Sequence, residues 1–226
     1  MLEQKLAALE DIYSIYHEFI DTREIVCKKG CSHCCTAGVT LTTLEGYQII
    51  HKLIEKGEPD IINRIQTAGV GKRYRPQTTI NQLAALCARG DNPPEEEGAA
   101  GTARCFILAA DECPLYDLRP FGCRCLVSRH NCGAKGYAEI DDFVLSVNTV
   151  FLQTIEHLDC PGCTGNLVDV LQTLSLVENR EAYCQNALHC TGNGLVANHL
   201  LTVLMLPPEH RKNMEPILQK LRKIKL

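Results

Sequence analysis

The feature that most constrains this chain is a dense group of cysteines near its amino terminus. Four of them fall within nine residues, at Cys27, Cys31, Cys34 and Cys35. Three more follow far along the chain, at Cys105, Cys113 and Cys123. An apolar core does not need thiols so closely spaced, whereas thiolates are soft donors that favour zinc, cuprous copper and iron–sulfur clusters. The sequence therefore predicts a soft-metal site that joins two distant segments.

The spacing within the first group indicates more than one simple zinc site. Cys31 and Cys34 have the two-residue gap of a metal knuckle, and Gly30 permits the tight turn that would point Cys27 and Cys31 inward. Adjacent side chains diverge in helices and strands, so Cys34 and Cys35 do not suit one tetrahedral ion. The seven thiols also exceed the four that close a structural zinc site. Either two metals share bridging sulfurs, or some cysteines are spare and available for redox chemistry.

Composition weakens the competing interpretation, a scaffold held together by disulfides. The chain has 226 residues, 45% of them hydrophobic, which is enough for one well-filled domain without staples. Its 14 cysteines make up about 6% of the residues, below the roughly 8–10% typical of a short secreted disulfide scaffold. We therefore expect a single cysteine-cluster, metal-binding domain over residues 1–226.

Charge and hydropathy limit the location and the partners. The first ten residues include Glu3, Lys5 and Glu10 and no uninterrupted apolar stretch of signal-peptide type. No segment approaches the roughly 20 apolar residues that span a bilayer, so we expect no membrane partner. The net charge of −4 gives no basic surface for a phosphate backbone, so we expect no nucleic-acid partner. We expect a cytoplasmic protein, in a compartment that keeps thiols reduced.

Apolar residues recur at intervals of three and four along most of the chain, which is the period of an amphipathic helix. Residues 42–45 have the form of a capping box, and strand signals are almost absent. The helices that we expect are 2–24, 43–56, 60–68, 79–88, 138–158, 167–177, 181–188, 196–206 and 209–223. The fold class is therefore all-α, with long cysteine-bearing loops over residues 25–130, a helical remainder over residues 138–226, and at most a short β-hairpin near residues 104–114.

These motifs resemble a known family, the YkgJ-like cysteine-cluster domains, which are described as zinc- or iron-chelating. The family signature joins a Cys-x-x-Cys-Cys cluster to a later Cys-Pro-x-Tyr-x-x-Arg-Pro-x-x-Cys-Arg segment. Here the first motif is residues 31–35, with Cys27 before it, and the second is residues 113–124. The resemblance also takes in Cys105 and covers residues 25–130.

The resemblance implies a metal centre of zinc or iron, as single ions or as an iron–sulfur cluster, but it supplies no reaction. Some relatives are described as iron–sulfur oxidoreductases or as flagellin lysine methylases. No glycine-rich loop after a strand offers a place for a nucleotide-like cofactor, so we do not carry the methylase activity over. The expected ligands are the seven cysteines named above.

A rival interpretation comes from the spacing Cys27-x-x-x-Cys31-x-x-Cys34, which is also the signature of radical S-adenosylmethionine enzymes. Those enzymes place the loop after the first strand of a (β/α) barrel, often with an aromatic residue before the last cysteine. In this chain a helix is expected before the loop, and strand–helix alternation is missing. His33 takes the aromatic place and Cys35 doubles the last cysteine. We therefore favour the cysteine-cluster interpretation.

Charged and imidazole side chains lie close to the cysteines in sequence. Arginine near sulfur offsets thiolate charge, and we expect Arg119 and Arg124 to donate hydrogen bonds to sulfur. Imidazole is a common metal ligand, and His33 lies inside the cysteine loop while His130 lies beside Cys132. With so many thiolates nearby, we expect cysteines to bind the metal without these histidines.

The remaining cysteines are expected to lie outside the main site. Cys160 and Cys163 form another two-residue pair. This pair is either a second metal knuckle, completed by Cys125 or Cys132, or a pair of structural or reversibly oxidised thiols. Three isolated cysteines are expected to pack in the core, as this residue type commonly does: Cys87, Cys184 and Cys190.

Two functional hypotheses follow. In the first, residues 27–35 and 105–123 jointly chelate zinc or iron and hold two parts of a helical domain together. In the second, the protein is an iron–sulfur oxidoreductase or electron carrier, in which surplus thiols and nearby cations tune a redox cluster. No serine–histidine–carboxylate grouping and no phosphate loop is indicated, so the sequence identifies no catalytic residue.

Overall fold

The computed structural model describes residues 1–69, 73–95, 103–190, 192 and 194–224. Over these residues it contains ten α-helices and one three-stranded antiparallel sheet. The structure is 52% helical and 7% strand, so the expected mainly helical fold is confirmed. No helix in the described ranges combines the length and the apolar character needed to cross a bilayer.

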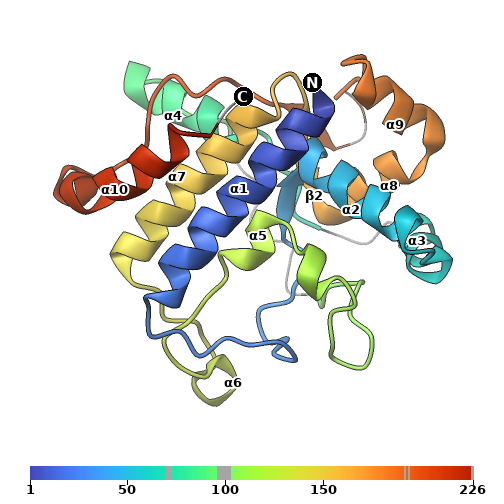
Figure 1. Cartoon of the computed structure of the whole chain (residues 1–226), viewed down its shortest axis with the longest axis horizontal. Coiled ribbons are helices and arrows are strands. Elements are labelled where there is room, and N and C mark those ends of the chain that lie inside the picture. Colours follow the sequence, from blue (N-terminus) through green and yellow to red (C-terminus); the bar gives the residue numbers. More distant parts are fainter. Residues whose placement is uncertain (70–72, 96–102, 191, 193, 225–226) are drawn as a thin grey trace.

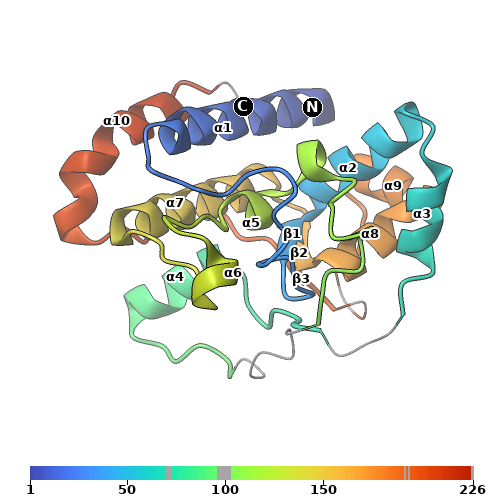
Figure 2. The same cartoon turned by 90° about the horizontal axis from the view of Figure 1, so that it is seen from below.

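Two long helices, α1 (Leu2–Asp21) and α7 (Asp142–Leu158), lie side by side (Figures 1 and 2). Aromatic side chains fill the space at their contact. The ring of Tyr16 meets the rings of Phe121 and Phe151 edge-on, with centroid distances of 4.7 and 5.2 Å. Phe121 begins the short helix that carries Cys123, so this packing places the second cysteine motif against the α1–α7 pair.

A second group of helices lies on the other side of the sheet (Figure 2): α2 (Thr43–Glu55), α3 (Pro59–Gln66), α8 (Leu167–Ser175) and α9 (Val177–Cys184). Gly46 lets α2 approach α8 closely, because a Cβ at this position would stand 2.5 Å from Cγ1 of Val170. The other helices are α4 (Ile80–Arg89), α5 (Phe121–Arg124), α6 (Cys132–Lys135) and α10 (Arg211–Leu221). Single 3-10 turns span Tyr116–Leu118 and Pro208–His210.

The sheet connects the two groups of helices. Its strands are β1 (Thr40–Thr42), β2 (Cys163–Asn166) and β3 (Leu195–Ala197), in that spatial order. β2 pairs antiparallel with both neighbours, with Leu41 opposite Gly165 and Thr164 opposite Val196. The sheet therefore brings the chain just after the first cysteines next to the start of α8.

The capping signal at the start of α2 was read correctly from the sequence. Oγ1 of Thr42 accepts a hydrogen bond from the backbone N–H of Glu45 at 3.3 Å, and Oε2 of Glu45 accepts one from the N–H of Thr42 at 2.9 Å. This reciprocal pair is the predicted capping box of α2. Thr79 caps α4, and Gly90 ends it at a positive φ of 77°.

The predicted helix over residues 196–206 is wrong. Its first residues belong to β3, and the rest has no helix, because its backbone N–H groups bond to side chains of α7. His199 N–H donates to Oε1 of Glu156 at 2.7 Å, and Met205 N–H donates to Oε1 of Gln153 at 2.8 Å. These bonds replace the helical ladder that the apolar spacing predicted.

The hairpin allowed near residues 104–114 is reduced to isolated bridges. Ala109 pairs with Glu112, and Thr36 pairs with Arg104, without extended strands on either side. The second bridge joins the two cysteine-bearing segments, which matters more for the site than a local hairpin would.

Candidate metal centre

The seven cysteines predicted as metal ligands all line one cavity of about 60 Å³. Four come from the first cysteine loop (residues 27–35), and three come from the second cysteine segment (residues 105–123). In Figure 1 the blue loop after α1 and the green segment before α5 gather at one end of the molecule. The structure therefore brings together every residue of the predicted set.

The first cysteine loop is shaped by tight turns. The N–H of Cys31 donates to the carbonyl of Lys28 at 3.1 Å, with Gly30 between them at a positive φ of 88°. This confirms the turn that the glycine was expected to permit. A second turn brings the N–H of Cys35 to the carbonyl of Ser32 at 3.1 Å. The four cysteines are thus held in a folded loop, not an extended one.

Backbone hydrogen bonds join this loop directly to the second cysteine segment. The N–H of Cys105 donates to the carbonyl of Cys35 at 3.0 Å, and the N–H of Ala37 donates to the carbonyl of Ala103 at 2.8 Å. Because Cys35 and Cys105 are connected through their own main chains, their side chains enter the cavity from neighbouring positions.

A buried carboxylate anchors the other end of the second segment. Glu45 is 3% exposed, and its Oε1 accepts hydrogen bonds from the N–H of Phe121 at 2.6 Å and from the hydroxyl of Tyr13 at 2.7 Å. Its Oε2 serves the capping box of α2. One side chain thereby ties the start of α5, which carries Cys123, to α1 and α2.

The proton positions within the cluster differ between neighbouring thiols. A hydrogen bond from Cys34 lowers the pKa of Cys35, and the same bond, followed by burial, raises the pKa of Cys34. Within this pair, Cys35 is therefore the thiol that ionises first. Burial raises the pKa of Cys123, and the neighbouring thiolates of Cys105 and Cys113 raise it further.

Arg119 supplies positive charge to this cavity. It lines the wall, and its guanidinium lies 3.6 Å from the centre of the Tyr116 ring. Its charge favours the ionised forms of Cys34, Cys113 and Cys123, which lowers the pKa of each thiol against the effect of burial.

The expectation that Arg119 and Arg124 donate to sulfur does not match the hydrogen bonds that the structure contains. Nε of Arg119 donates to the carbonyl of Tyr116 at 2.9 Å, and Nε of Arg124 donates to the carbonyl of Arg119 at 2.6 Å. Arg124 also lies over the ring of Tyr13 at 4.4 Å. These contacts brace the second cysteine motif, because backbone carbonyls at a tight turn offer better acceptors than thiols do.

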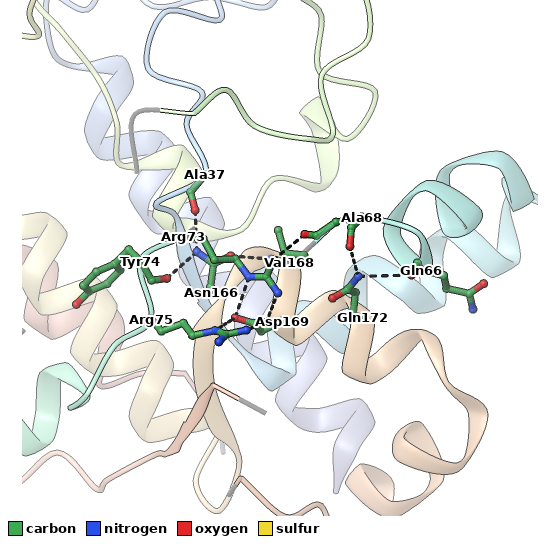
Figure 3. Close-up of polar contacts among 11 residues, drawn as sticks. Ala37, Gln66, Ala68, Arg73, Tyr74, Arg75, Asn166, Val168, Asp169 and Gln172 are labelled. Atoms are coloured by element: carbon green, nitrogen blue, oxygen red, sulfur yellow. Dashed lines mark hydrogen bonds and ion pairs between the residues drawn. The ribbon is translucent and has the colours of Figure 1, made fainter. Parts of the chain in front are cut away.

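A polar cluster beside the cavity fixes the exit of the first loop (Figure 3). Nδ2 of Asn166 donates to the carbonyls of Ala37 at 2.7 Å and Tyr74 at 2.9 Å, while its Oδ1 caps α8. In the next turn, Asp169 accepts hydrogen bonds from Arg73 and Arg75. The cluster holds the segment after Cys35 against α8, whose first residue, Leu167, also lines the cavity.

The cavity is not a closed coordination site. In the part of the chain that the structure describes, no three histidine, cysteine, aspartate or glutamate side chains stand where they would already hold a metal ion. The donor set itself consists of thiols in a mainly apolar wall, which fits a soft metal. Binding would require the ligands to draw closer together.

The remaining cysteines behave differently from the expectations. Cys163 forms a disulfide with Cys190, with an S–S distance of 1.99 Å. This excludes one of the two alternatives for Cys160 and Cys163, the metal knuckle. The other alternative, a structural or oxidised pair, holds only for Cys163, whose partner is Cys190, because Cys160 is a free thiol. Cys190 was expected only to pack in the core. Cys87 and Cys184 are exposed, which contradicts the same expectation, because each lies on the solvent side of its helix.

A second cavity, of about 430 Å³, adjoins the first. It shares Cys27 and Cys31 with the first cavity and adds His33, His130 and Cys132. We expected these histidines not to bind metal, although the proximity of His130 to Cys132 is visible in the sequence. The contact between residues 128–132 and the first loop was not predictable from local signals.

Comparison with family models, curated proteins and solved structures found no match for this chain. The geometry of its own residues therefore carries the functional argument.

Proposed function

We propose that this protein is a metal-binding cysteine-cluster protein that chelates zinc or iron through the first cysteine loop and the second cysteine segment. The observation that carries the proposal is that all seven cysteines of these two segments line one cavity. Thiols far apart in sequence are brought to one place by backbone hydrogen bonds at Cys35 and Cys105 and by the anchor at Glu45.

The pKa values of the thiols support a site whose thiols lose their protons when a soft metal binds. The pKa of Cys35 is lowered by the hydrogen bond from Cys34, which favours its thiolate form. Burial raises the pKa of Cys105 and Cys113, so these thiols are neutral until a metal displaces their protons. Binding is then coupled to proton release and to local closure, as expected where no complete site exists beforehand.

The relationship to the YkgJ-like domains is part of this proposal. Its support is that the two motifs of the family signature, residues 31–35 and residues 113–124, supply the cavity wall from opposite segments. Residues between the cysteines of the second motif have structural uses, because the guanidinium of Arg119 lies over the ring of Tyr116 and the backbone N–H of Phe121 donates to Glu45.

A second candidate function is that of an iron–sulfur oxidoreductase or electron carrier. Seven thiols are more than one tetrahedral ion takes, and the wall between them is apolar, including Val39, Ile107 and Leu115. Burial in such surroundings is one of the factors that set the potential of a cluster. The radical-enzyme alternative gains no support, because the described strands are antiparallel and form no (β/α) barrel.

A reducing compartment follows from the proposal, and we place the protein in the cytoplasm on that ground. The metal-binding thiols must be kept reduced. The Cys163–Cys190 disulfide lies away from the cavity and is not among the proposed ligands.

The metal can be identified by purification without oxygen, followed by elemental analysis and visible and paramagnetic spectra. Stoichiometric zinc without a chromophore supports a zinc chelator and rules out the iron–sulfur alternative. Iron with visible absorption and a paramagnetic signal after reduction supports the redox function. Protein that folds and contains neither metal contradicts the proposal.

A further inference from the structure

The second cavity carries three metal-binding side chains that the proposed centre does not use, His33, His130 and Cys132. Its wall combines residues of the first cysteine loop with residues that follow α5 in sequence. The side chains in this wall that are able to bind metal are Cys27, Cys31, His33, His130 and Cys132. Mixed imidazole and thiolate donors in a small number are typical of zinc.

His130 is the most informative of these residues. Its Nε2 is buried and has no hydrogen-bond partner, and among the described residues it is the one buried side-chain nitrogen or oxygen in that situation. Burying an unpaired polar atom costs about 1–3 kcal/mol, so such an atom calls for a ligand. The side chain is 16% exposed and lines the second cavity.

The other ring nitrogen of His130 is held by a carboxylate. Nδ1 lies 2.9 Å from Oε2 of Glu139. With the Nδ1 proton donated to this carboxylate, Nε2 carries the free lone pair. A histidine that ligates metal through one nitrogen commonly donates its other N–H to a carboxylate, which fixes the ring and raises its basicity. His130 is therefore oriented as a metal ligand.

The loop that presents His130 is well braced. Oγ of Ser128 accepts hydrogen bonds from the N–H of His130 at 3.3 Å and of Glu139 at 3.1 Å. The carbonyl of Ser128 accepts one from the N–H of Val26 at 3.1 Å. Because Cys27 follows Val26 directly, this bond sets the start of the first cysteine loop beside the loop that carries His130.

Cys132 and Cys27 face the same space. Sγ of Cys132 lies 3.8 Å from the carbonyl oxygen of His130, and Asn131 caps the short helix that Cys132 begins. Cys27, Cys31 and Cys132 all line the second cavity, although Cys132 lies outside the family motif.

The thiols of the first cavity divide in a matching way. Five of the seven cysteines line the first cavity and not the second: Cys34, Cys35, Cys105, Cys113 and Cys123. They are enough to close one structural zinc site, which takes four ligands. Cys27 and Cys31 are left at the boundary with the second cavity, where Cys132 and His130 complete another set of four.

We propose that the chain has a second, zinc-binding site made of Cys27, Cys31, Cys132 and Nε2 of His130. Glu139 is its positioning residue. Each thiol releases its proton to solvent as its sulfur binds zinc, and the imidazole binds in its neutral form. The inference rests on the proposed function of the metal centre in the first cavity, which we call the inner centre. Two ligands of the second site, Cys132 and His130, do not line that cavity.

The test measures zinc and iron per chain, by elemental analysis, in the reduced full-length protein after equilibration with Zn²⁺ and removal of the excess. We expect Cys132→Ser and His130→Gln each to lose one equivalent of zinc, while the metal of the inner site stays. Cys184→Ser, which changes an exposed cysteine, is the control and keeps all metal. Glu139→Gln should lower the zinc affinity of the second site about 10- to 100-fold, measured by competition with a chelator, and leave the affinity of the inner centre unchanged.

The outcomes separate the two proposals. If Cys132→Ser and His130→Gln both keep the full metal content while Cys113→Ser loses metal, the second site is wrong and the inner centre stands. If the unaltered protein binds no metal, both are wrong. A measurement that needs no variant is alkylation with mass spectrometry: added Zn²⁺ should protect Cys132 and leave Cys87 reactive, and equal reactivity of Cys132 with and without Zn²⁺ overturns the second site.

Discussion

The backbone N–H of Phe121 donates a hydrogen bond of 2.6 Å to the carboxylate of Glu45. Glu45 belongs to the capping box that starts α2, and Phe121 starts the helix that carries Cys123. A signal that is purely local in the sequence therefore also anchors one half of the candidate metal centre. The link matters because the centre draws its cysteines from two segments that only tertiary structure brings together.

Replacing this anchor should cost both stability and metal. The carboxylate of Glu45 accepts hydrogen bonds from Phe121, Tyr13 and Thr42, and Glu45→Gln replaces one of its oxygens by an N–H₂ group that cannot accept them. We therefore expect the free energy of unfolding to fall by about 2–4 kcal/mol. Denaturant unfolding of the reduced protein measures the loss. Glu55→Gln is the control, since Glu55 is exposed at the end of the same helix, and should leave stability nearly unchanged. Equal stability of the two variants would show that Glu45 is not an anchor.

The arginine pair on Asp169 predicts a pH dependence of stability. Burial opposes the charged form of Asp169, but hydrogen bonds from Arg73 and Arg75 outweigh it and hold the pKa of this carboxyl below its usual range. The folded pKa is lower than the unfolded one. The ion pairs therefore stabilise the protein fully above the unfolded value of about 3.9, and this contribution disappears as the pH falls through the folded value.

Asp169→Asn measures that contribution. At pH 7 we expect the variant to be less stable by about 3 kcal/mol, because Arg73 loses its buried partner. The difference from the unaltered protein should shrink as the pH is lowered below about 4. Asp91→Asn, at an exposed pair with Arg89, should show little difference at any pH. A difference for Asp169→Asn that stays constant from neutral to acid pH would contradict the assignment.

The Cys163–Cys190 disulfide should stabilise the fold only under oxidising conditions. It closes a loop with a sequence separation of 27 residues, for which the loss of chain entropy in the unfolded state corresponds to about 3 kcal/mol. Cys190→Ser should be less stable by that amount without reductant. With reductant, the unaltered protein should become as unstable as the variant. Cys184→Ser should behave like the unaltered protein in both conditions; an effect of Cys190→Ser that persists in reductant would instead indicate a packing role.

Sequence reasoning was accurate where the signal is local or dense. The capping box at Thr42 depends on neighbouring residues alone. The grouping of the seven cysteines was also predictable, because their density has no explanation in ordinary core packing.

Features created by tertiary contact were not predictable in the same way. The strands of the sheet have three or four residues, too few for a period of two to be seen, and the backbone of residues 198–206 bonds to side chains of α7. Because β3 was not predicted, the disulfide was not predicted either: the chain between β2 and β3 brings Cys190 back to Cys163. The orientation of His130 depends on Glu139, nine positions away in a loop without regular structure.

The most direct measurement is the metal content of variants from each side of the cavity, purified without oxygen. Cys35→Ser alters the first cysteine loop, Cys113→Ser alters the second cysteine segment, and Cys87→Ser is the matched control at an exposed cysteine outside both. The two-segment centre predicts stoichiometric zinc or iron in the unaltered protein and in Cys87→Ser, and loss of at least one equivalent in each of the other two variants. Undiminished metal in folded Cys35→Ser and Cys113→Ser would contradict it.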